Sequence, residues 1–399
     1  MTQKSAQFWT SEINEKAEIL NPFEGRGPIR FYDTTLRDGE QTVGVVFNPD
    51  QKVEIAGLLD QLGVARIEAG FPRVSEADYE AFARILDLDL RAEVWGFSRA
   101  LAADVEALVE LGVRHAVIEV PTSTIKLEAY GLSREKVIER ATAAIQLACN
   151  HSIEVAFFAV DGTRTEPGFL KEIYQAAIAA GAKEAVVVDT IGACNPEAVE
   201  FLVRSMREWL GSEVPIHFHG HDDFGLATAS AIAAVRGGAE WIQGTINGMG
   251  ERAGNADLSE VALALQGLYD VPVALDLSQA RAVAQRIQEL GRYSLAPWKP
   301  LVGDNLFTRE SGAVAAQFHI PSAIEPYSAE LVGADRGLVL GKKSGLASVD
   351  LKAVELGLAI PEGQRAEILA RVKDLGVSKG RLVTDDEFRA LVEMQAQRR

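Results

Sequence analysis

Three histidines fall within five residues of this chain, at positions 217, 219 and 221, and Asp222 and Asp223 follow at once. The whole sequence contains only six histidines, so half of them lie in one short segment that reads as a strand. Alternate residues of a strand point to the same side, so His217, His219 and His221 present their imidazoles to one place. This pattern is typical of a site for a divalent ion such as Zn²⁺, Mn²⁺, Co²⁺ or Mg²⁺. The residues alone do not say which two imidazoles bind.

Two other segments carry residue types that suit such a site. Arg37 and Asp38 adjoin in the string from Asp33 to Gln41, where a carboxylate can bind a metal and a guanidinium can stabilise an oxyanion. Residues 244–255 contain four glycines and end at Asn255, whose amide oxygen is a further candidate ligand. Alone, the first segment fits an incidental ion pair and the second a flexible or phosphate-binding loop. Beside the histidine cluster, we interpret both as parts of one site.

Eight short apolar runs alternate with helical patterns and predict the elements that position these residues. The runs are 29–33, 65–69, 93–97, 116–120, 153–158, 185–189, 215–219 and 241–245. Amphipathic helices are predicted between them, for example over 49–62 and 196–210. Eight such units predict a closed (β/α)₈ TIM barrel of the α/β class. An open, doubly wound sheet is the weaker alternative, because no Gly-x-Gly-x-x-Gly turn follows the first run.

The barrel prediction explains where the unusual polar residues stand. Active sites of this fold lie at the carboxyl ends of the strands. The polar residues that end or follow the eight runs are Arg37, Asp38, Glu68, Arg99, Ser123, Asp161, Thr190, His219, His221 and Asn255. We therefore expect them to meet at one mouth of the barrel.

Four regions are predicted along the chain. Residues 1–28 form an N-terminal arm, and 29–283 form the barrel. Residues 284–345 are irregular and rich in Gly and Pro, which indicates a linker subdomain, and 346–399 form a helical C-terminal subdomain.

Composition narrows the class of protein. The 399 residues carry a net charge of −17, which argues against a nucleic-acid partner. No apolar run is long enough to span a membrane, and the polar N-terminus does not look like a targeting peptide. The two cysteines, Cys149 and Cys194, lie far apart without a CxxC motif, which fits a reducing, cytoplasmic compartment.

Three strings together resemble a known superfamily of metal-dependent TIM-barrel acyltransferases and lyases. They are Asp-Thr-Thr-Leu-Arg-Asp-Gly-Glu-Gln at 33–41, Gly-Glu-Arg-Ala-Gly-Asn at 250–255 and Leu-Val-Leu-Gly-Lys-Lys-Ser-Gly at 338–345. The superfamily contains homocitrate, isopropylmalate and citramalate synthases and hydroxymethylglutaryl-CoA lyases, and the resemblance runs from residue 32 to about 345. Because the C-terminus lacks a large regulatory domain, the chain looks most like the homocitrate synthase branch.

The resemblance implies a divalent metal, a 2-oxo acid and an acyl-CoA as partners, and a homodimer. The metal ligands that it implies are Asp38, His219, His221 and Asn255. His217 would then not bind the metal directly. Arg37 corresponds to the arginine that contacts the keto oxygen, and Thr190 to a hydroxyl that binds the oxo-acid carboxylate. Glu68, Arg99 and Ser123 correspond to positions that line the substrate pocket.

The chain departs from the synthase pattern where the family transfers protons. Val160 precedes Asp161 where the synthases have a glutamate, residues 309–314 lack the two linker histidines, and Ile324 stands where a tyrosine is expected. Removal of a proton beside a thioester needs a positioned base. The candidates near these positions in sequence are Glu310, His319 and Tyr327. Arg309 is a candidate for binding an anionic substrate group, or else pairs with Glu310 or Glu325.

Three functions remain open at this point. The first, which overall similarity favours, is a Claisen-type condensation of an acyl-CoA with a 2-oxo acid, with proton-transfer residues that differ from those of the synthases. The second is a metal-dependent aldolase or C–C lyase that acts on a 2-oxo or 2-hydroxy acid without acetyl-CoA. The third is a catalytically silent relative.

Overall fold

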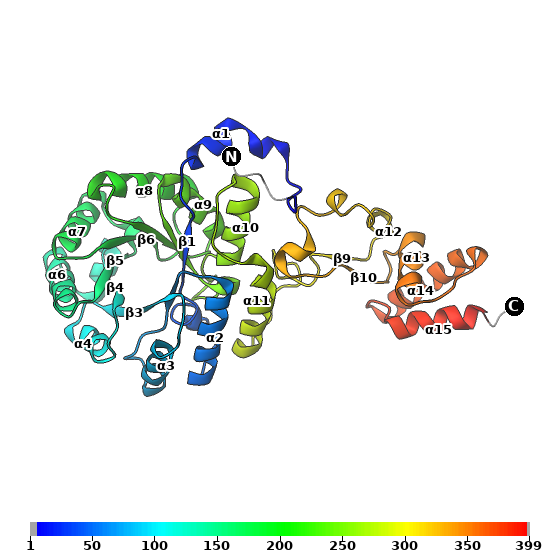
Figure 1. Cartoon of the computed structure of the whole chain (residues 1–399), viewed down its shortest axis with the longest axis horizontal. Helices are drawn as coiled ribbons and strands as arrows, with labels where there is room; N and C mark the ends of the chain where they lie inside the picture. The colour runs from blue at the N-terminus through cyan, green and yellow to red at the C-terminus, as the bar shows by residue number, and fades with distance from the viewer. Residues whose placement is uncertain (1–5, 397–399) are drawn as a thin grey trace. The chain divides into compact units, whose positions relative to one another are not determined.

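The computed structural model describes residues 6–396 and contains a closed barrel of eight parallel strands (Figure 1). Each strand pairs with its neighbours in chain order, and β1 closes the barrel by pairing with β8. The strands are β1 (Arg30–Asp33), β2 (Arg66–Glu68), β3 (Glu93–Arg99), β4 (His115–Pro121), β5 (Glu154–Val160), β6 (Glu184–Asp189), β7 (Ile216–Gly220) and β8 (Trp241–Gly244). All eight predicted runs are strands, and the predicted TIM barrel is confirmed.

Helices lie outside the strands and connect them (Figure 1). They are α2 (Pro49–Leu62), α3 (Glu76–Leu86), α4 (Ala102–Glu110), α5 (Thr124–Tyr130), α6 (Arg134–Asn150), α7 (Pro167–Ala179), α8 (Pro196–Leu210), α9 (Ala227–Gly237), α10 (Leu258–Tyr269) and α11 (Leu277–Gly291). Local sequence sets their bounds: Asn48 and Gln51 form a capping box at the start of α2, and Gly63 ends it in the left-handed region at φ 91°. Helices α2, α7 and α8 each begin with a proline at N1, namely Pro49, Pro167 and Pro196.

Large apolar side chains fill the barrel interior between its two ends. The buried cluster consists of Tyr32, Trp95, Phe97, Val117, Ala156, Phe158, Val186, Val188 and Trp241. These residues alternate along their strands with residues that face the outer helices, as the two-residue period of a strand requires. The interior is therefore a packed core, and chemistry is confined to the ends of the strands.

An ionic network closes the amino end of the barrel. Arg66 donates two hydrogen bonds to Glu184, at 2.6 and 3.0 Å, and its guanidinium lies between the rings of Trp95 and Trp241. His217 Nε2 lies 2.6 Å from Glu184, and Gln243 Nε2 lies 3.2 Å from His217 Nδ1. The short Nε2 contact assigns the proton of a neutral His217 to Nε2, so Nδ1 accepts from Gln243. His217 thus belongs to this network and supports the strands.

The described chain divides into two compact units. One contains Ser11–Leu295, and the other contains residues 296–396 together with 6–10. The predicted arm 1–28 and C-terminal subdomain 346–399 both extend into residues outside the described range. The predicted boundary at 283/284 falls within α11, and the four-region division remains a prediction. None of the helices in residues 6–396 is both long and apolar enough to cross a membrane.

The second unit combines irregular chain with a small helical core. Its elements are β9 (Thr308–Arg309), α12 (Gly312–Ala315), β10 (Gly337–Leu338), α13 (Leu346–Glu355), α14 (Arg365–Lys379) and α15 (Asp385–Ala396). Strands β9 and β10 pair in parallel, and the three long helices bury a cluster around Phe388, Ile368 and Val372. The helical tail thus has a core of its own, to which Leu340 of the linker contributes.

We predict that Glu184→Gln destabilises the barrel. The substitution removes the negative charge that Arg66 and His217 share, and losing one partner of a buried pair costs about 3 kcal/mol of unfolding free energy. Urea unfolding at pH 7 measures this loss. Glu172→Gln, on the exposed face of α7, is the matched control and should leave the unfolding free energy unchanged.

The destabilisation should also depend on pH. Burial would raise the pKa of Glu184, but the hydrogen bonds from His217 and Arg66 and the charge of the Arg66 guanidinium outweigh it and hold the pKa at about 2. A depressed folded-state pKa gives stability that is complete above the ordinary value of 4.5 and is lost as the pH falls toward 2. The difference between wild type and Glu184→Gln should therefore shrink between pH 5 and pH 3, and a constant difference would contradict this assignment.

Candidate active site

Hydrogen bonds connect the loop after β1 to the loop after β8, and they support the residues of the site. Asp33 is buried and accepts hydrogen bonds from Thr35 N at 2.8 Å and Thr35 Oγ1 at 3.0 Å. Thr35 Oγ1 in turn accepts from Ile246 N at 2.9 Å, and Thr34 N donates to Gly244 O at 2.8 Å. These bonds explain the polar start of the Asp33–Gln41 string, because they hold the turn that carries Arg37 and Asp38.

Asp38, His219 and His221 converge at the carboxyl end of the barrel. All three are buried, and the candidate ligand atoms lie within 4.8 Å of one another. Asp38 Oδ2 is 3.3 Å from His219 Nε2 and 3.4 Å from His221 Nε2. The two histidines stand two residues apart at the end of β7, so the strand period brings both imidazoles to Asp38, as the sequence pattern predicts.

The protonation states of this group suit a cation. Burial would raise the pKa of Asp38, but Arg37 and the imidazole hydrogen bonds outweigh it and hold the pKa well below the ordinary value. Burial lowers the pKa of His219 to about 4, so its imidazole is neutral at pH 7. A charged carboxylate and neutral imidazoles are the forms in which these groups bind metal.

Asn255 lies against the same carboxylate. Its Nδ2 donates to Asp38 Oδ2 and to Met249 O, both at 2.9 Å, while its Oδ1 is buried without a hydrogen-bond partner. The glycine-rich loop makes this approach possible. Gly250, at φ 152°, has no room for a Cβ beside the Asn255 amide, and a Cβ on Gly254, at φ 89°, would meet Gly248 O. The glycines therefore serve a tight loop that folds back on itself, rather than flexibility.

Arg37 is held in place by a carboxylate and an aromatic ring. Its Nε donates to Glu68 Oε2 at 2.7 Å, its Nη1 lies 3.3 Å from Asp38 Oδ1, and its guanidinium lies 4.1 Å from the Phe97 ring centroid. Glu68 is buried and also accepts from Tyr32 Oη at 3.2 Å. Arg37 Nη2 is buried and has no hydrogen-bond partner. Glu68 thus orients Arg37 and leaves one donor for a ligand.

Thr190 and Ser123 both contact Asp161, with different consequences. Asp161 follows β5 in the left-handed region at φ 64°, and its backbone N donates to Thr190 Oγ1 at 2.7 Å. Thr190 therefore accepts one bond and keeps its own hydroxyl proton for another partner. Ser123 Oγ donates to Asp161 Oδ2 and caps the start of α5 by accepting from Lys126 N, so its proton is used within the protein.

Arg99 is only loosely associated with the mouth. Its guanidinium makes two hydrogen bonds to Asp104, at 2.6 and 3.1 Å, and half of its side chain is exposed. The pocket roles of Arg99, Ser123 and Glu68 stay predictions. In the structure, all three side chains already have a protein partner.

The second unit holds the other predicted residues. Arg309 Nη1 donates to Leu306 O at 2.7 Å and to Thr308 O at 3.1 Å, and its Nη2 lies 3.8 Å from Glu325 Oε1. Arg309 therefore holds local backbone and lies near Glu325, one of the two partners that the sequence suggests, and its role in binding a substrate anion stays a prediction.

The three candidate bases of this unit differ in their surroundings. Glu310 accepts from Lys343 N at 2.9 Å, and its other oxygen lies 3.4 Å from Lys343 Nζ. His319 is exposed. Tyr327 is buried, with its ring edge-on to those of Phe8 and Phe307. Proton-transfer roles for Glu310, His319 and Tyr327 remain predictions.

Sequence reasoning missed one carboxylate at the barrel mouth, Glu119 of β4. The run Ala116-Val-Ile-Glu-Val120 predicts a strand, and its glutamate is absent from the predicted site residues. A signal was present, since Glu119 is its only charged residue and stands two positions from Val117 of the interior cluster, hence on the inner face.

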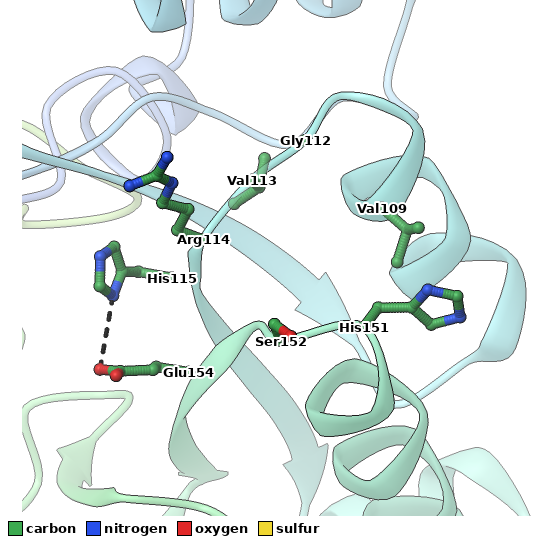
Figure 2. Close-up of a pocket in the computed structure, with 8 residues that line it drawn as sticks. All are labelled: Val109, Gly112, Val113, Arg114, His115, His151, Ser152 and Glu154. Atoms are coloured by element: carbon green, nitrogen blue, oxygen red, sulfur yellow. Dashed lines mark ion pairs between the residues drawn. The ribbon is translucent and has the colours of Figure 1, made fainter.

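A shallow hollow of about 440 Å³ lies at the opposite end of β4 and β5 (Figure 2). Its lining includes His115, His151 and Glu154, and His115 Nδ1 lies 3.7 Å from Glu154 Oε2. Figure 2 shows the two imidazoles on opposite sides of Ser152, too dispersed to form a ligand group. The convergent chemistry is therefore at the carboxyl end.

Comparison with known proteins identifies the family. The sequence profile of the HMGL-like family matches residues 28–287, and that of the homocitrate synthase post-HMGL domain-like family matches residues 301–380. The chain belongs to the HMGL-like family. The metal dependence of this family agrees with the buried Asp-His-His group.

Several curated relatives are similar over most of the chain. Homocitrate synthase AksA of Methanopyrus kandleri is 43% identical, over 90% of this chain and 91% of that protein. A putative (R)-citramalate synthase CimA of Archaeoglobus fulgidus is 41% identical, over 92% and 75%. The 2-isopropylmalate synthase of Methanocaldococcus jannaschii is 40% identical, over 92% and 71%. The chain is thus an enzyme of the acyltransferase type that these condensing synthases represent.

Solved structures agree on the fold. The hydroxymethylglutaryl-CoA lyase of Pseudomonas aeruginosa superposes with a TM-score of 0.61 at 20% identity, over 67% of this chain and 94% of that one. The lyase of Brucella melitensis gives 0.60 at 19% identity, over 67% and 100%. At this identity, the likeness concerns the barrel architecture alone.

We predict that His219→Ala abolishes metal binding and activity. Loss of an outer partner of a metal ligand already costs about 10–100-fold in affinity, so loss of a ligand should cost at least about 100-fold. Titration calorimetry with Mn²⁺ or Co²⁺ measures the affinity. The exposed His151→Ala is the matched control, and near-normal metal binding or turnover in His219→Ala would refute the site.

Proposed function

We propose that this enzyme catalyses a Claisen-type condensation of an acyl-CoA with a 2-oxo acid, as a homocitrate synthase-like acyltransferase that needs a divalent cation. The observation that carries the proposal is Arg37. Its Nη2 is a buried donor without a partner, beside the convergent group of Asp38, His219 and His221. A developing alkoxide is the kind of charge that such a fixed donor stabilises.

The donor set fits a divalent ion. Asp38, His219 and His221 would supply one oxygen and two nitrogens, and Asn255 would supply Oδ1, which is buried without a partner. The amide of Asn255 now presents Nδ2 to Asp38, so its side chain would have to turn to offer the oxygen. Mixed imidazole and oxygen donors suit Zn²⁺, Mn²⁺, Co²⁺ or Mg²⁺. When bound, such an ion polarises a carbonyl group toward attack.

The remaining groups at the mouth would hold the 2-oxo acid. The free proton of Thr190 would bind its carboxylate, and Arg37 Nη2 would contact its keto oxygen. Glu68 would keep Arg37 in this orientation through their 2.7 Å bond. Together these contacts would fix the electrophilic carbon at one place at the mouth.

Further partners follow from the same proposal. Residues 301–380 match the homocitrate synthase post-HMGL domain-like family, and from this resemblance we expect a homodimer. Sedimentation velocity tests the dimer independently of activity.

Thiol release tests the reaction. The enzyme is incubated with acetyl-CoA and with longer acyl-CoAs across a panel of 2-oxo acids, and free CoA is measured. Release that needs both substrates, stops with EDTA and returns with a divalent metal supports the condensation. Formation of pyruvate or oxaloacetate from a larger acid without acyl-CoA would instead favour the C–C lyase.

We predict that Arg37→Lys lowers kcat by about 10²–10³-fold, the loss seen when one oxyanion donor is removed. Lysine keeps the charge that Glu68 and Asp38 need, but it cannot contact Glu68 and a keto oxygen at the same time through a planar fork. Metal affinity should be unchanged, which separates this effect from damage to the metal group. Arg114→Lys, exposed at the other end of the barrel, is the control. A variant that kept the wild-type kcat would contradict the role of Arg37.

A further inference from the structure

Glu119 stands on the inner face of the barrel at the level of the candidate site. In the sheet register it pairs with Arg99 of β3 and with Phe158 of β5. The Phe158 ring lies in the interior cluster, 5.2 Å from the His219 imidazole by ring centroids. The backbone of β4 therefore fixes Glu119 one strand away from an aromatic ring that contacts a candidate metal ligand.

Glu119 differs from the other carboxylates at this mouth because its side chain makes no hydrogen bond or ion pair with any residue between 6 and 396, although its backbone oxygen accepts from Ala100 N. Asp38 is bound by Asn255, and Glu68 by Arg37. Asp161 is bound by Ser123 and Arg164. A mostly buried carboxylate without a partner lowers the free energy of unfolding. Its presence at the mouth of the barrel is explained if it acts on a bound ligand.

Charged groups on four elements face Glu119. Arg37, Arg99 and Lys126 favour its ionised form, and Glu68 opposes it. None of the three cations forms an ion pair with it: Arg37 is engaged by Glu68, and Arg99 by Asp104. Burial is the dominant effect and raises the pKa of Glu119 to about 7. A carboxylate with this pKa accepts protons far better than an ordinary glutamate while still being half ionised at neutral pH.

We propose that Glu119 is the general base that removes the proton from the α-carbon of the acyl-CoA. The proposal rests on the proposed condensation and names the group that its altered proton-transfer set lacks. It also assigns this step to the barrel, where the position before Asp161 is Val160, a side chain packed on the interior cluster and unable to accept a proton.

The step balances as follows. The C–H bond next to the thioester breaks, its proton goes to a Glu119 carboxylate oxygen, and the electron pair forms the enolate. The enolate carbon bonds to the keto carbon of the 2-oxo acid, whose oxygen becomes an alkoxide beside Arg37. The alkoxide takes a proton from water, and Glu119 returns its proton to the solvent, which regenerates the base. Water hydrolyses the thioester, releasing CoA thiol and a carboxylic acid.

The test compares Glu119→Gln, Glu119→Asp and the control Glu128→Gln, which changes an exposed glutamate of α5. The metal-loaded enzymes are assayed for CoA release from pH 5.5 to 9 with the acyl-CoA and 2-oxo acid that wild type uses. A general base contributes about 10²–10⁴-fold, so kcat of Glu119→Gln should fall by at least about 10²-fold. The rise of wild-type kcat/KM with pH through about 7 should disappear in this variant. Glu119→Asp should keep that rise at a lower rate.

Binding measurements separate this role from a structural one. Calorimetry should show unchanged affinity of Glu119→Gln for Mn²⁺ and for the 2-oxo acid, and circular dichroism an unchanged fold. A variant with wild-type kcat and pH profile, or one in which only KM for the 2-oxo acid rises, overturns the proposal. Wild-type enzyme that releases no CoA with any substrate pair overturns the proposed condensation and this proposal with it.

Discussion

One guanidinium shared between two buried carboxylates organises the mouth of this barrel. Arg37 contacts Glu68 at 2.7 Å and Asp38 at 3.3 Å. Both carboxylates are buried, so water does not compete with Arg37 for them. Two negative charges and one positive charge leave a net negative site beside the neutral imidazole of His219. This excess of negative charge favours binding of a cation at Asp38, and it is the electrostatic basis of the proposed chemistry.

The two ends of the barrel use the same residue types for opposite purposes. At the amino end, Arg66 and Glu184 form a two-point contact, and His217 completes the pairing of the carboxylate. At the carboxyl end, Arg37 and Asn255 each retain a buried polar atom without a partner. Buried polar atoms are normally satisfied, so the two unpartnered atoms beside Asp38 indicate a place for a ligand, whereas Arg66 and Glu184 pair with each other and support the strands.

Much of the fold and part of the site could be predicted from the sequence, for an identifiable reason. Strand and helix periods, caps and turns are local, so all eight strands and helices such as α2 and α8 follow from neighbouring residues. The convergence of His219 and His221 follows from the same two-residue period. The contacts of His217, Ser123 and Arg99 could not be predicted, because their partners Glu184, Asp161 and Asp104 are brought to them only by the fold. The sequence places Glu119 on the inner face of its strand, but only the structure shows that its carboxylate has no partner among residues 6–396.

The location of a base within the barrel bears on how precisely the enzyme can hold its reacting atoms. A strand that hydrogen bonds to two neighbours fixes its side chains better than irregular chain does, and proton transfer tolerates little error in distance. Glu119 on β4 and Arg37 beside β1 are positioned by the same closed sheet, whereas Glu310 is bound to Lys343 in the second unit. An enzyme with Val160 and Ile324 at the usual proton-transfer positions can therefore retain the chemistry if the base lies on the inner face of β4. The elevated pKa that burial gives Glu119 is then part of its catalytic function, rather than only a cost to the stability of the fold.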